Sequence, residues 1–475
     1  MNSAYRKLDS SALDRLREIV GAENVLTGDD DLEKYSHDEV AELHYLPEAA
    51  VKASSTEHVS RVLRLANEAR FPVTPRGAGQ GLSGGAVPVH GGVVLSLEKM
   101  NRILEIDQDN LMAVVEPGVI TGDLHRAVEA VGLFYPPDPA SLDSCSIGGN
   151  IAENAGGPRA VKYGVTREYV RGMEVVLPSG EVVNLGGKLV KDVAGYDLPQ
   201  LLLGSEGTLA IVTKAILRLI PLPPVRVDLL APFNDFRSAS QTVSAIIRNR
   251  IVPTALEFFG KDCVLAVEAL AQKEIPHRDA AAHLLITLDG HDASAVEREY
   301  ERVGEICMEN GALDVLVADS PKLRDKLWEA RRLIIEALKH LSPEKIMDTQ
   351  DLVVPRARIP DLIERIEGIA KTHAMKIVCF GHSGDGNVHV NIIKDMPDDV
   401  WKTKKAGAAA DMYEAAISMG GTITGEHGIG LTRREYLPLA VPAPAIRLMK
   451  QIRDAFDPHC ILNPGKIFPK NQDGR

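Results

Sequence analysis

Two histidines flank a glycine-rich turn and could share one metal ion. Asp385-Gly386 predicts a tight type I′ hairpin turn. Two apolar, β-branched strand segments surround it: residues 376–380 and 388–393. A hairpin centred on this turn pairs His382 with His389, and directly opposed Cβ atoms lie only about 4.5–5.5 Å apart. Both imidazoles could then bind one ion, with Asn391 on the same strand face as His389.

A carboxylate that could complete this site follows later in the chain, at Glu426 in the segment 425–428. Two histidines and one carboxylate leave coordination positions open for a substrate, and this ligand set suits Zn²⁺ or Fe²⁺ better than Mg²⁺. The alternative is a glycine-rich hairpin whose histidines are structural residues of the core.

Length, charge and cysteine content exclude several classes of protein. A chain of 475 residues predicts two or three domains. The formal net charge of −12 disfavours a nucleic-acid-binding surface. We find neither an apolar segment long enough to span a membrane nor a signal peptide. The five scattered cysteines, with no Cys-x-x-Cys, fit a reducing cytoplasm and argue against an iron–sulfur cluster.

Strand-like and helix-like patterns alternate along the chain, which predicts an α+β fold. A proline cluster near residue 221 marks a domain exit. We therefore expect three parts: a domain over 1–221, a second α+β domain over 222–420, and a helical segment over 421–475 that returns to the first. The clearest expected helices and strands are residues 10–20, 55–70, 238–248 and 294–310 for helices, and 91–97 and 282–288 for strands.

The glycines concentrate in three groups within the first domain: residues 75–85, 144–157 and 204–209. Glycines at alternate positions can bring successive backbone N–H groups close to an anion, which suits a pyrophosphate. No Lys-Ser or Lys-Thr follows, so the first group is not a nucleotide-binding P-loop of the Walker type. In the second group, small residues allow backbone to pack against a large planar ligand. The alternative for the first group is a flexible linker.

The ordered combination of these glycine groups with the two metal-region motifs resembles the flavoproteins of the vanillyl-alcohol oxidase and p-cresol methylhydroxylase type. Within them it is most similar to the glycolate oxidase flavin subunit, D-lactate dehydrogenase and D-2-hydroxyglutarate dehydrogenase group. The resemblance implies a two-subdomain FAD-binding domain followed by an α+β substrate domain. Since Gln80 stands in the first loop, where covalent members carry His or Cys, we expect noncovalent FAD. The implied FAD-binding residues are Arg76, Gly77, Ala78, Gly79, Gln80, Gly81, Leu82, Ser83, Pro137, Asp138, Ser146, Gly148, Gly149, Asn150, Asn154, Gly156, Gly157, Glu206, Gly207, Ile211, Asn463 and Lys466.

The same resemblance assigns roles to the second half of the chain. The implied metal ligands are His382, His389 and Glu426, and the implied catalytic and substrate-binding residues are Arg331, Asn391 and His427. Oxidation of a 2-hydroxy acid requires a base for the hydroxyl proton, a carboxylate clamp and an orienting Lewis acid, while the Cα hydrogen leaves as hydride to flavin N5. His427 has a suitable pKa for the base, and Arg331 can bind a carboxylate through two hydrogen bonds. The alternatives are an exposed ion pair of Arg331 with Glu329 or Glu336, and a solvent-exposed His427.

Departures from the family pattern bear on the substrate. Members that oxidise 2-hydroxyglutarate carry a threonine and a lysine for the second carboxylate, where this chain has Ile335 and Thr349. Because an apolar residue and a neutral hydroxyl stabilise a distal charge poorly, a small monocarboxylate is favoured. Asn391, in contrast, is typical of the hydroxyglutarate enzymes and favours 2-hydroxyglutarate as the substrate.

We therefore expect an FAD- and metal-dependent dehydrogenase that oxidises D-lactate or glycolate, with a D-2-hydroxyglutarate dehydrogenase as the alternative. The absence of a cysteine cluster or nicotinamide fingerprint implies that electrons leave to another carrier, such as an electron-transfer flavoprotein or an iron–sulfur subunit. We expect a cytoplasmic protein, associated with a soluble or membrane-bound electron-transfer complex. Two other classes stay open: a metallohydrolase, and a non-catalytic flavin subunit that relays electrons.

Overall fold

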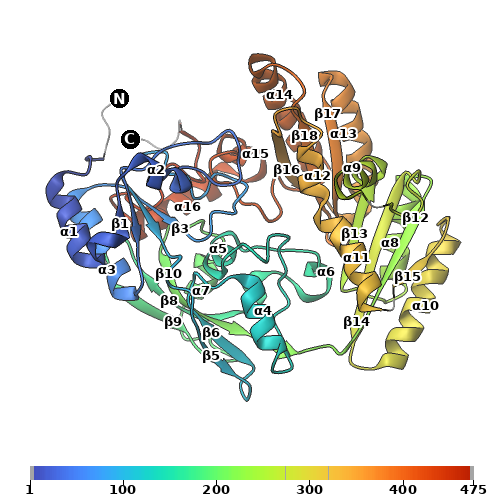
Figure 1. Ribbon diagram of the computed structural model, residues 1–475, viewed down its shortest axis with the longest axis horizontal. Helices are drawn as coiled ribbons and strands as arrows, with labels where there is room; N and C mark the ends of the chain where they lie inside the picture. The colour runs from blue at the N-terminus through green and yellow to red at the C-terminus, as the bar shows by residue number, and fades with distance from the viewer. Residues whose placement is uncertain (1–4, 273, 319, 471–475) are drawn as a thin grey trace. The chain divides into compact units, whose positions relative to one another are not determined.

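A computed structural model describes residues 5–272, 274–318 and 320–470 and confirms the α+β class. The chain forms two compact units. The first contains Met1–Ala155, Val165–Leu222 and Glu426–Arg475, and the second contains Gly156–Gly164 and Pro223–Gly425. The short α6 (Ala160–Tyr163) thus groups with the second unit, although it lies within the first part of the sequence. Figure 1 shows the elements of both units.

The first unit begins with a four-stranded sheet in the order β1-β2-β4-β3. Its strands are β1 (Val25–Leu26), β2 (Ala49–Lys52), β3 (Val73–Arg76) and β4 (Val93–Ser96). The pairings β2–β4 and β4–β3 are parallel, and the pairing β1–β2 is antiparallel. The covering helices are α1 (Ser10–Val20) and α3 (Thr56–Ala69), and Ser55 caps α3 by accepting the N–H of His58. Both expected helices are confirmed.

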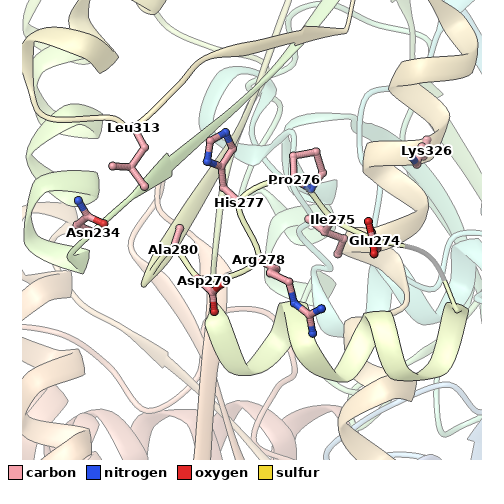
Figure 2. A pocket seen from close by; sticks show the side chains of 10 residues that line it. All are labelled: Asn234, Glu274, Ile275, Pro276, His277, Arg278, Asp279, Ala280, Leu313 and Lys326. Atoms are coloured by element: carbon pink, nitrogen blue, oxygen red, sulfur yellow. The ribbon is translucent and has the colours of Figure 1, made fainter.

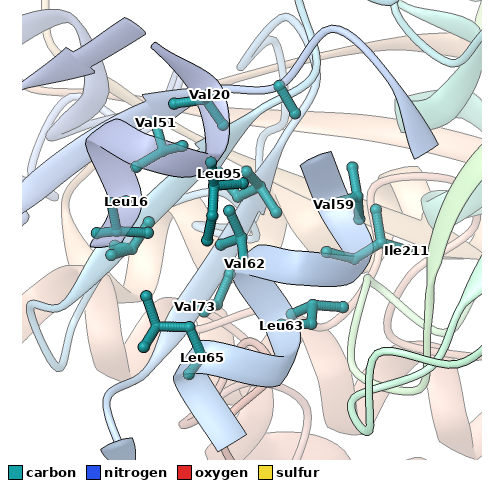
Figure 3. Packing of buried hydrophobic residues seen from close by; sticks show 14 of the residues in the cluster. Leu16, Val20, Val51, Val59, Val62, Leu63, Leu65, Val73, Leu95 and Ile211 are labelled. Atoms are coloured by element: carbon teal, nitrogen blue, oxygen red, sulfur yellow. The ribbon is translucent and has the colours of Figure 1, made fainter. Parts of the chain in front are cut away.

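An apolar core joins these helices to the sheet (Figure 3). Val59, Val62, Leu63 and Ala66 recur at the three- and four-residue spacing of one helix face, and all are fully buried. They pack against strand residues that include Val73 and those of the sheet interior. The core therefore anchors the start of β3 at Val73, and β3 leads directly into the first glycine group.

A second sheet of the first unit is antiparallel, in the order β5-β6-β10-β8-β9. Its strands are β5 (Ile103–Asp107), β6 (Met112–Val115), β8 (Val170–Val176), β9 (Val182–Gly186) and β10 (Ile211–Arg218). The remaining elements of this unit are α2 (Asp29–Leu32), α4 (Thr121–Glu129), β7 (Leu133–Phe134), α5 (Ile147–Glu153), α7 (Leu198–Leu202), β11 (Ile220–Pro221), α15 (Leu437–Ala440) and α16 (Ala443–Phe456).

The second unit is built on a seven-stranded sheet in the order β15-β12-β14-β13-β17-β18-β16. Its strands are β12 (Val225–Phe233), β13 (Ala255–Gly260), β14 (Ala282–Gly290), β15 (Leu316–Ala318), β16 (Met347–Val353), β17 (Lys376–His382) and β18 (Asn387–Ile393). Its helices are α8 (Phe236–Arg248), α9 (Lys261–Ala271), α10 (Ala293–Glu309), α11 (Pro321–Arg332), α12 (Ile334–Lys339), α13 (Ile359–His373) and α14 (Asp398–Ser418).

Helices cover both faces of this sheet, as alternate residues of β13 show. Phe258 contacts Phe236 of α8, with ring centroids 4.9 Å apart. Its neighbour Phe259 points the other way, into an apolar cluster with residues of α9 and α12. Glu257 lies two residues before Phe259 and therefore on the same face as α9 and α12. This buried face carries the polar side chains described next.

Candidate functional site

The hairpin of β17 and β18 brings His382 and His389 together, but not in the expected register. Residues 383–386 form the connection, which is longer than a two-residue type I′ turn, and only Gly386 has positive φ. His382 therefore pairs with Asn387, and His389 pairs with Phe380. The prediction of a type I′ turn with directly opposed histidines was wrong, because the longer loop shifts the pairing. The two imidazoles are diagonal neighbours on one sheet face.

The two rings meet edge to face through their outer nitrogens. The Nε2 atoms of His382 and His389 lie 3.2 Å apart, and both side chains are buried. Two nitrogens bound to one tetrahedral zinc at about 2.0–2.1 Å are separated by about 3.3 Å. The distance in this chain thus fits two ligands of one ion. The diagonal pairing brings the two nitrogens as close as the directly opposed pairing was expected to bring them.

A buried carboxylate orients His382. Glu257 Oε1 lies 2.6 Å from His382 Nδ1, and its Oε2 accepts hydrogen bonds from Arg331. Burial alone would raise the pKa of Glu257, but attraction to His382 and Arg331 outweighs burial and holds the pKa below its usual value. Sequence reasoning missed Glu257. The available signal was a lone carboxylate inside an apolar strand, which needs a partner when it is buried.

Arg331 is not an exposed helix residue. It lies at the end of α11 with its side chain 7% exposed, and it pairs with Glu257 at 2.5 Å. Its guanidinium also lies 4.7 Å from the centre of the Phe380 ring. The alternative of a surface ion pair with Glu329 or Glu336 is therefore wrong. Arg331 instead belongs to the polar group around His382.

A second buried carboxylate, Asp351 of β16, lies beside His389. Asp351 Oδ1 is 3.5 Å from His389 Nδ1, and both residues offer atoms suited to a metal ion. The other oxygen accepts the N–H of Gly425 at 2.8 Å. Gly425 is the last residue of the second unit, and Glu426 and His427 follow it directly in the chain. Asp351 was also missed by sequence reasoning, since its strand is distant in sequence from the hairpin.

The residues considered for substrate choice have separate roles in the second unit. Asn391 is buried, and its amide oxygen accepts a hydrogen bond from Thr349 Oγ1 at 3.0 Å. Ile335 packs against the apolar cluster of α9 and α12. Thr349 is thus tied to Asn391, and Ile335 contributes to the core.

In the first unit, the first two glycine groups lie against each other. Gln80 Oε1 accepts a hydrogen bond from Ser144 Oγ at 3.0 Å. A Cβ added at Gly77 would lie 2.3 Å from Ser146 Oγ, and one at Gly148 would lie 2.7 Å from Pro117 Cβ. Side chains at these positions would fill the space between the segments. The backbone is therefore held close and bare, as a loop around a large cofactor requires.

Residues of the third glycine group contact the C-terminal segment. The Glu206 carboxylate accepts the N–H groups of Ile429 and Gly430 at 2.8 and 2.7 Å. The Asn463 amide donates to the carbonyls of Gly85 and Glu206 at 3.0 and 2.7 Å. The predicted residues of the first and third groups and of the C-terminal segment thus meet within one unit.

The other predicted cofactor residues are placed as follows. Ser146 caps α5, and its Oγ accepts the N–H of Gly149 at 3.3 Å. Asn154 ends this helix in a left-handed conformation, and Ile211 of β10 packs into the apolar core between the first sheet and its helices. The remaining predicted positions of the first unit lie in the glycine groups or close to them: Arg76, Ala78, Gly79, Gly81, Leu82, Ser83, Pro137, Asp138, Asn150 and Gly207. Gly156 and Gly157 group with the second unit.

Buried ionisable groups surround these loops. Burial lowers the pKa of Lys466 to about 7 and raises that of Asp38 to about 6. Burial and then repulsion from Glu206 raise the pKa of Glu153 well above its usual value. Lys466 Nζ donates to the Val87 carbonyl at 2.5 Å. Burial therefore disfavours the charged forms of all three side chains beside these loops.

A separate cavity of about 870 Å³ opens on the second unit (Figure 2). Two of its lining residues pair with their neighbours: His277 with Asp314 at 3.2 Å and Asp279 with Lys261 at 2.9 Å. None of the predicted site residues lines it. We therefore do not assign it to the chemistry of the histidine pair.

Comparison with known proteins identifies the chain at two levels. A model described as an FAD binding domain matches residues 47–186, which include the first two glycine groups, so the chain is of the flavin-dependent oxidoreductase class. A second model, described as the C-terminal domain of FAD linked oxidases, matches residues 222–467, and the chain belongs to this family of FAD-linked oxidases. The expected family resemblance is confirmed.

Several curated relatives match along nearly the whole chain. The glycolate oxidase subunit GlcD of Bacillus subtilis is 44% identical over 96% of this chain and 97% of its own. The D-lactate dehydrogenase of Anaerostipes hadrus is 40% identical over 98% and 99%, and the D-2-hydroxyglutarate dehydrogenase of Stutzerimonas stutzeri is 36% identical over 97% and 99%.

A solved structure supports the fold. Substrate-bound p-cresol methylhydroxylase superposes with a TM-score of 0.82 at 21% identity, over 98% of this chain and 97% of that one. Across the residues that the structure describes, we find no helix with the length and hydropathy of a membrane span.

Proposed function

We propose that this chain is an FAD- and metal-dependent dehydrogenase that oxidises a small D-2-hydroxy acid, D-lactate or glycolate, to the 2-oxo acid. The observation that carries the metal requirement is the 3.2 Å separation of the two Nε2 atoms, with a carboxylate beside the Nδ1 atom of each ring. The Glu257 carboxylate favours Nδ1–H on His382, so the Nε2 lone pair of His382 faces His389. A cation bound between the two Nε2 atoms would hold both rings together.

The residues of the second unit would divide the work on the substrate. His382 and His389, with Glu426, would hold the ion, and Arg331 would bind the substrate carboxylate. Asn391 would contact the substrate from the buried face of β18. His427 would accept the hydroxyl proton. When bound, the metal supplies a Lewis acid for the hydroxyl group, and FAD supplies the hydride acceptor.

The first unit would bind FAD without a covalent link, because Gln80 occupies the position where covalent members carry His or Cys. The remaining predicted cofactor positions would surround the same molecule. Flavin that stays with the polypeptide after acid precipitation would contradict a noncovalent link.

Electrons would leave the flavin to a protein acceptor, an electron-transfer flavoprotein or an iron–sulfur subunit. The names of two relatives support this. One is a subunit of a glycolate oxidase, and the other is a D-lactate dehydrogenase. We expect slow reaction with oxygen. Peroxide formed as fast as a dye is reduced would mark an oxidase instead.

Anaerobic titration with a panel of 2-hydroxy acids tests the proposal through flavin absorbance. We expect bleaching by D-lactate or glycolate at lower concentration than by D-2-hydroxyglutarate. Preference for D-2-hydroxyglutarate would support the second candidate, which Asn391 favours. A flavin that no hydroxy acid reduces would leave the metallohydrolase or the relay subunit.

A further inference from the structure

Glu257 is the one acidic residue in the strand β13, between Leu256 and Phe258. Its side chain is fully buried, and each of its oxygens has a different partner. Oε1 faces His382 Nδ1 at 2.6 Å, and Oε2 accepts from Arg331 Nε at 2.9 Å and lies 2.5 Å from Arg331 Nη2. Both oxygens are therefore committed to residues of the proposed site.

This arrangement determines which nitrogen of His382 carries the proton. An ionised carboxylate can only accept hydrogen bonds, so Nδ1 must be the donor. The lone pair then lies on Nε2, which faces His389 Nε2 at 3.2 Å. If Glu257 could not accept, the other tautomer would place a proton where a ligand atom is required.

Arg331 in turn fixes the carboxylate. The Nε and Nη2 edge of its rigid guanidinium faces one oxygen of Glu257, while Phe380 lies 4.7 Å from the guanidinium carbon. The carboxylate cannot rotate away from His382 without leaving a buried arginine unpaired, which is strongly unfavourable. Its orientation toward His382 is therefore enforced from two sides.

We propose that Glu257 is a positioning residue that selects the metal-binding tautomer of His382. The inference rests on the proposed function, because it assumes that the histidine pair binds a metal ion. It assigns to Glu257 an effect on metal affinity that is separate from its role as the counter-ion of Arg331.

The test uses Glu257→Gln, which keeps size and shape. The side-chain amide oxygen of the glutamine would face Arg331, because the glutamine NH₂ group and the guanidinium are both donors and repel each other. Its NH₂ group would then point at His382 Nδ1 and impose the wrong tautomer. Loss of a carboxylate that orients a metal-bound histidine typically weakens metal affinity by about 10–100-fold.

Asp228→Asn provides a matched control. Asp228 is a fully buried carboxylate of β12 in the same sheet, and it accepts from Trp328 Nε1 at 3.1 Å and pairs with Arg226 at 3.1 Å. It contacts neither histidine of the pair. The two variants thus make the same chemical change at equally buried positions, with and without a histidine partner.

Zinc affinity is measured on the purified flavoprotein, stripped of metal and titrated with Zn²⁺ against a chromophoric chelator. We expect Glu257→Gln to weaken zinc binding by about 10–100-fold and Asp228→Asn by less than about threefold. Pyruvate affinity, followed by perturbation of the oxidised flavin spectrum, should change little in Glu257→Gln. Flavin absorbance and the melting temperature report on folding.

The outcomes separate the two proposals. Parent protein that binds no zinc and no Fe²⁺ would overturn the metal requirement, and this inference with it. Parent protein that binds zinc, together with unchanged zinc affinity in Glu257→Gln, would overturn only the role of Glu257. An equal loss of zinc and pyruvate affinity would show a structural role. If Glu257→Gln does not fold, Glu257→Asp decides by the same zinc titration, because it keeps the charge and withdraws it from His382 by one methylene.

Discussion

The glycine loops of the first unit are shaped by backbone atoms, whereas the histidine pair of the second unit is held by side chains. The loops consist of bare backbone at close approach, where an added Cβ at Gly148 would lie 2.7 Å from Pro117. The histidine pair consists of buried side chains that hold one another, such as Glu257 between His382 and Arg331. The first kind of site should fail when atoms are added, and the second when atoms are removed.

Removal of a histidine of the pair gives the largest expected effect. His382→Ala should abolish turnover and metal content together while FAD stays bound, because most of the predicted FAD-binding residues belong to the other unit. Metal analysis, flavin absorbance and steady-state dye reduction measure the three properties.

His373→Ala is the control for that variant. His373 lies on α13 of the same unit and pairs with Asp411 at 2.7 Å, so its loss should leave metal and turnover near parent values. Full activity in a metal-free preparation of the parent would contradict the prediction.

The next largest effect concerns the proton acceptor. His427→Asn should slow anaerobic single-turnover reduction of the flavin by D-lactate by about 10²–10⁴-fold, the usual cost of losing a general base. FAD and metal content should stay at parent levels. A rate within about threefold of the parent across roughly pH 6–9 would reject His427 as the base.

Gly148→Ala in α5 tests whether the glycine loops fail when an atom is added. The new methyl group would meet Pro117, whose ring and backbone cannot rotate aside, so the loops must shift. We expect a loss of about 1–3 kcal/mol in the free energy of unfolding and weaker FAD binding. Chemical denaturation and FAD titration of the apoprotein are the measurements, and parent-like values in both would refute close packing here.

The smallest effect should have the opposite sign. Gly368→Ala makes the same substitution in α13, where nothing lies within 4 Å of the added Cβ. Alanine in an exposed helix interior should stabilise the second unit by about 0.5–1 kcal/mol. Denaturation curves for the two alanine variants compare the two units directly. If Gly368→Ala is destabilised, an added methyl group also does harm where the backbone is uncrowded, and the contrast between the units is wrong.

Local patterns in the sequence predicted most of the framework. The spacing of Val59, Val62 and Leu63 and the capping residue Ser55 defined α3 to within a residue at each end. The β-branched segments around Asp385-Gly386 predicted both strands of the hairpin. These signals depend only on neighbours in the chain, so they can be read without a structure.

Pairings between distant segments could not be predicted in the same way. The register of His382 and His389 depended on loop length, which the turn residues did not define. Glu257 reaches His382 across 125 positions of sequence, and Asp351 lies on a third strand. A lone carboxylate in an apolar strand indicates a buried partner, but only the sheet order shows which partner it is.

The C-terminal segment has a consequence for how the protein is made. Residue Leu462 forms a bridge with Val73, and Lys466 reaches Val87 across 379 positions of the chain. The sheet edge beside the first glycine group is therefore completed by residues that leave the ribosome long after the strands of that sheet. Contacts so distant in sequence form slowly, because a long loop must close first. The first unit should finish folding, and take up its cofactor, only after these last residues have been synthesised.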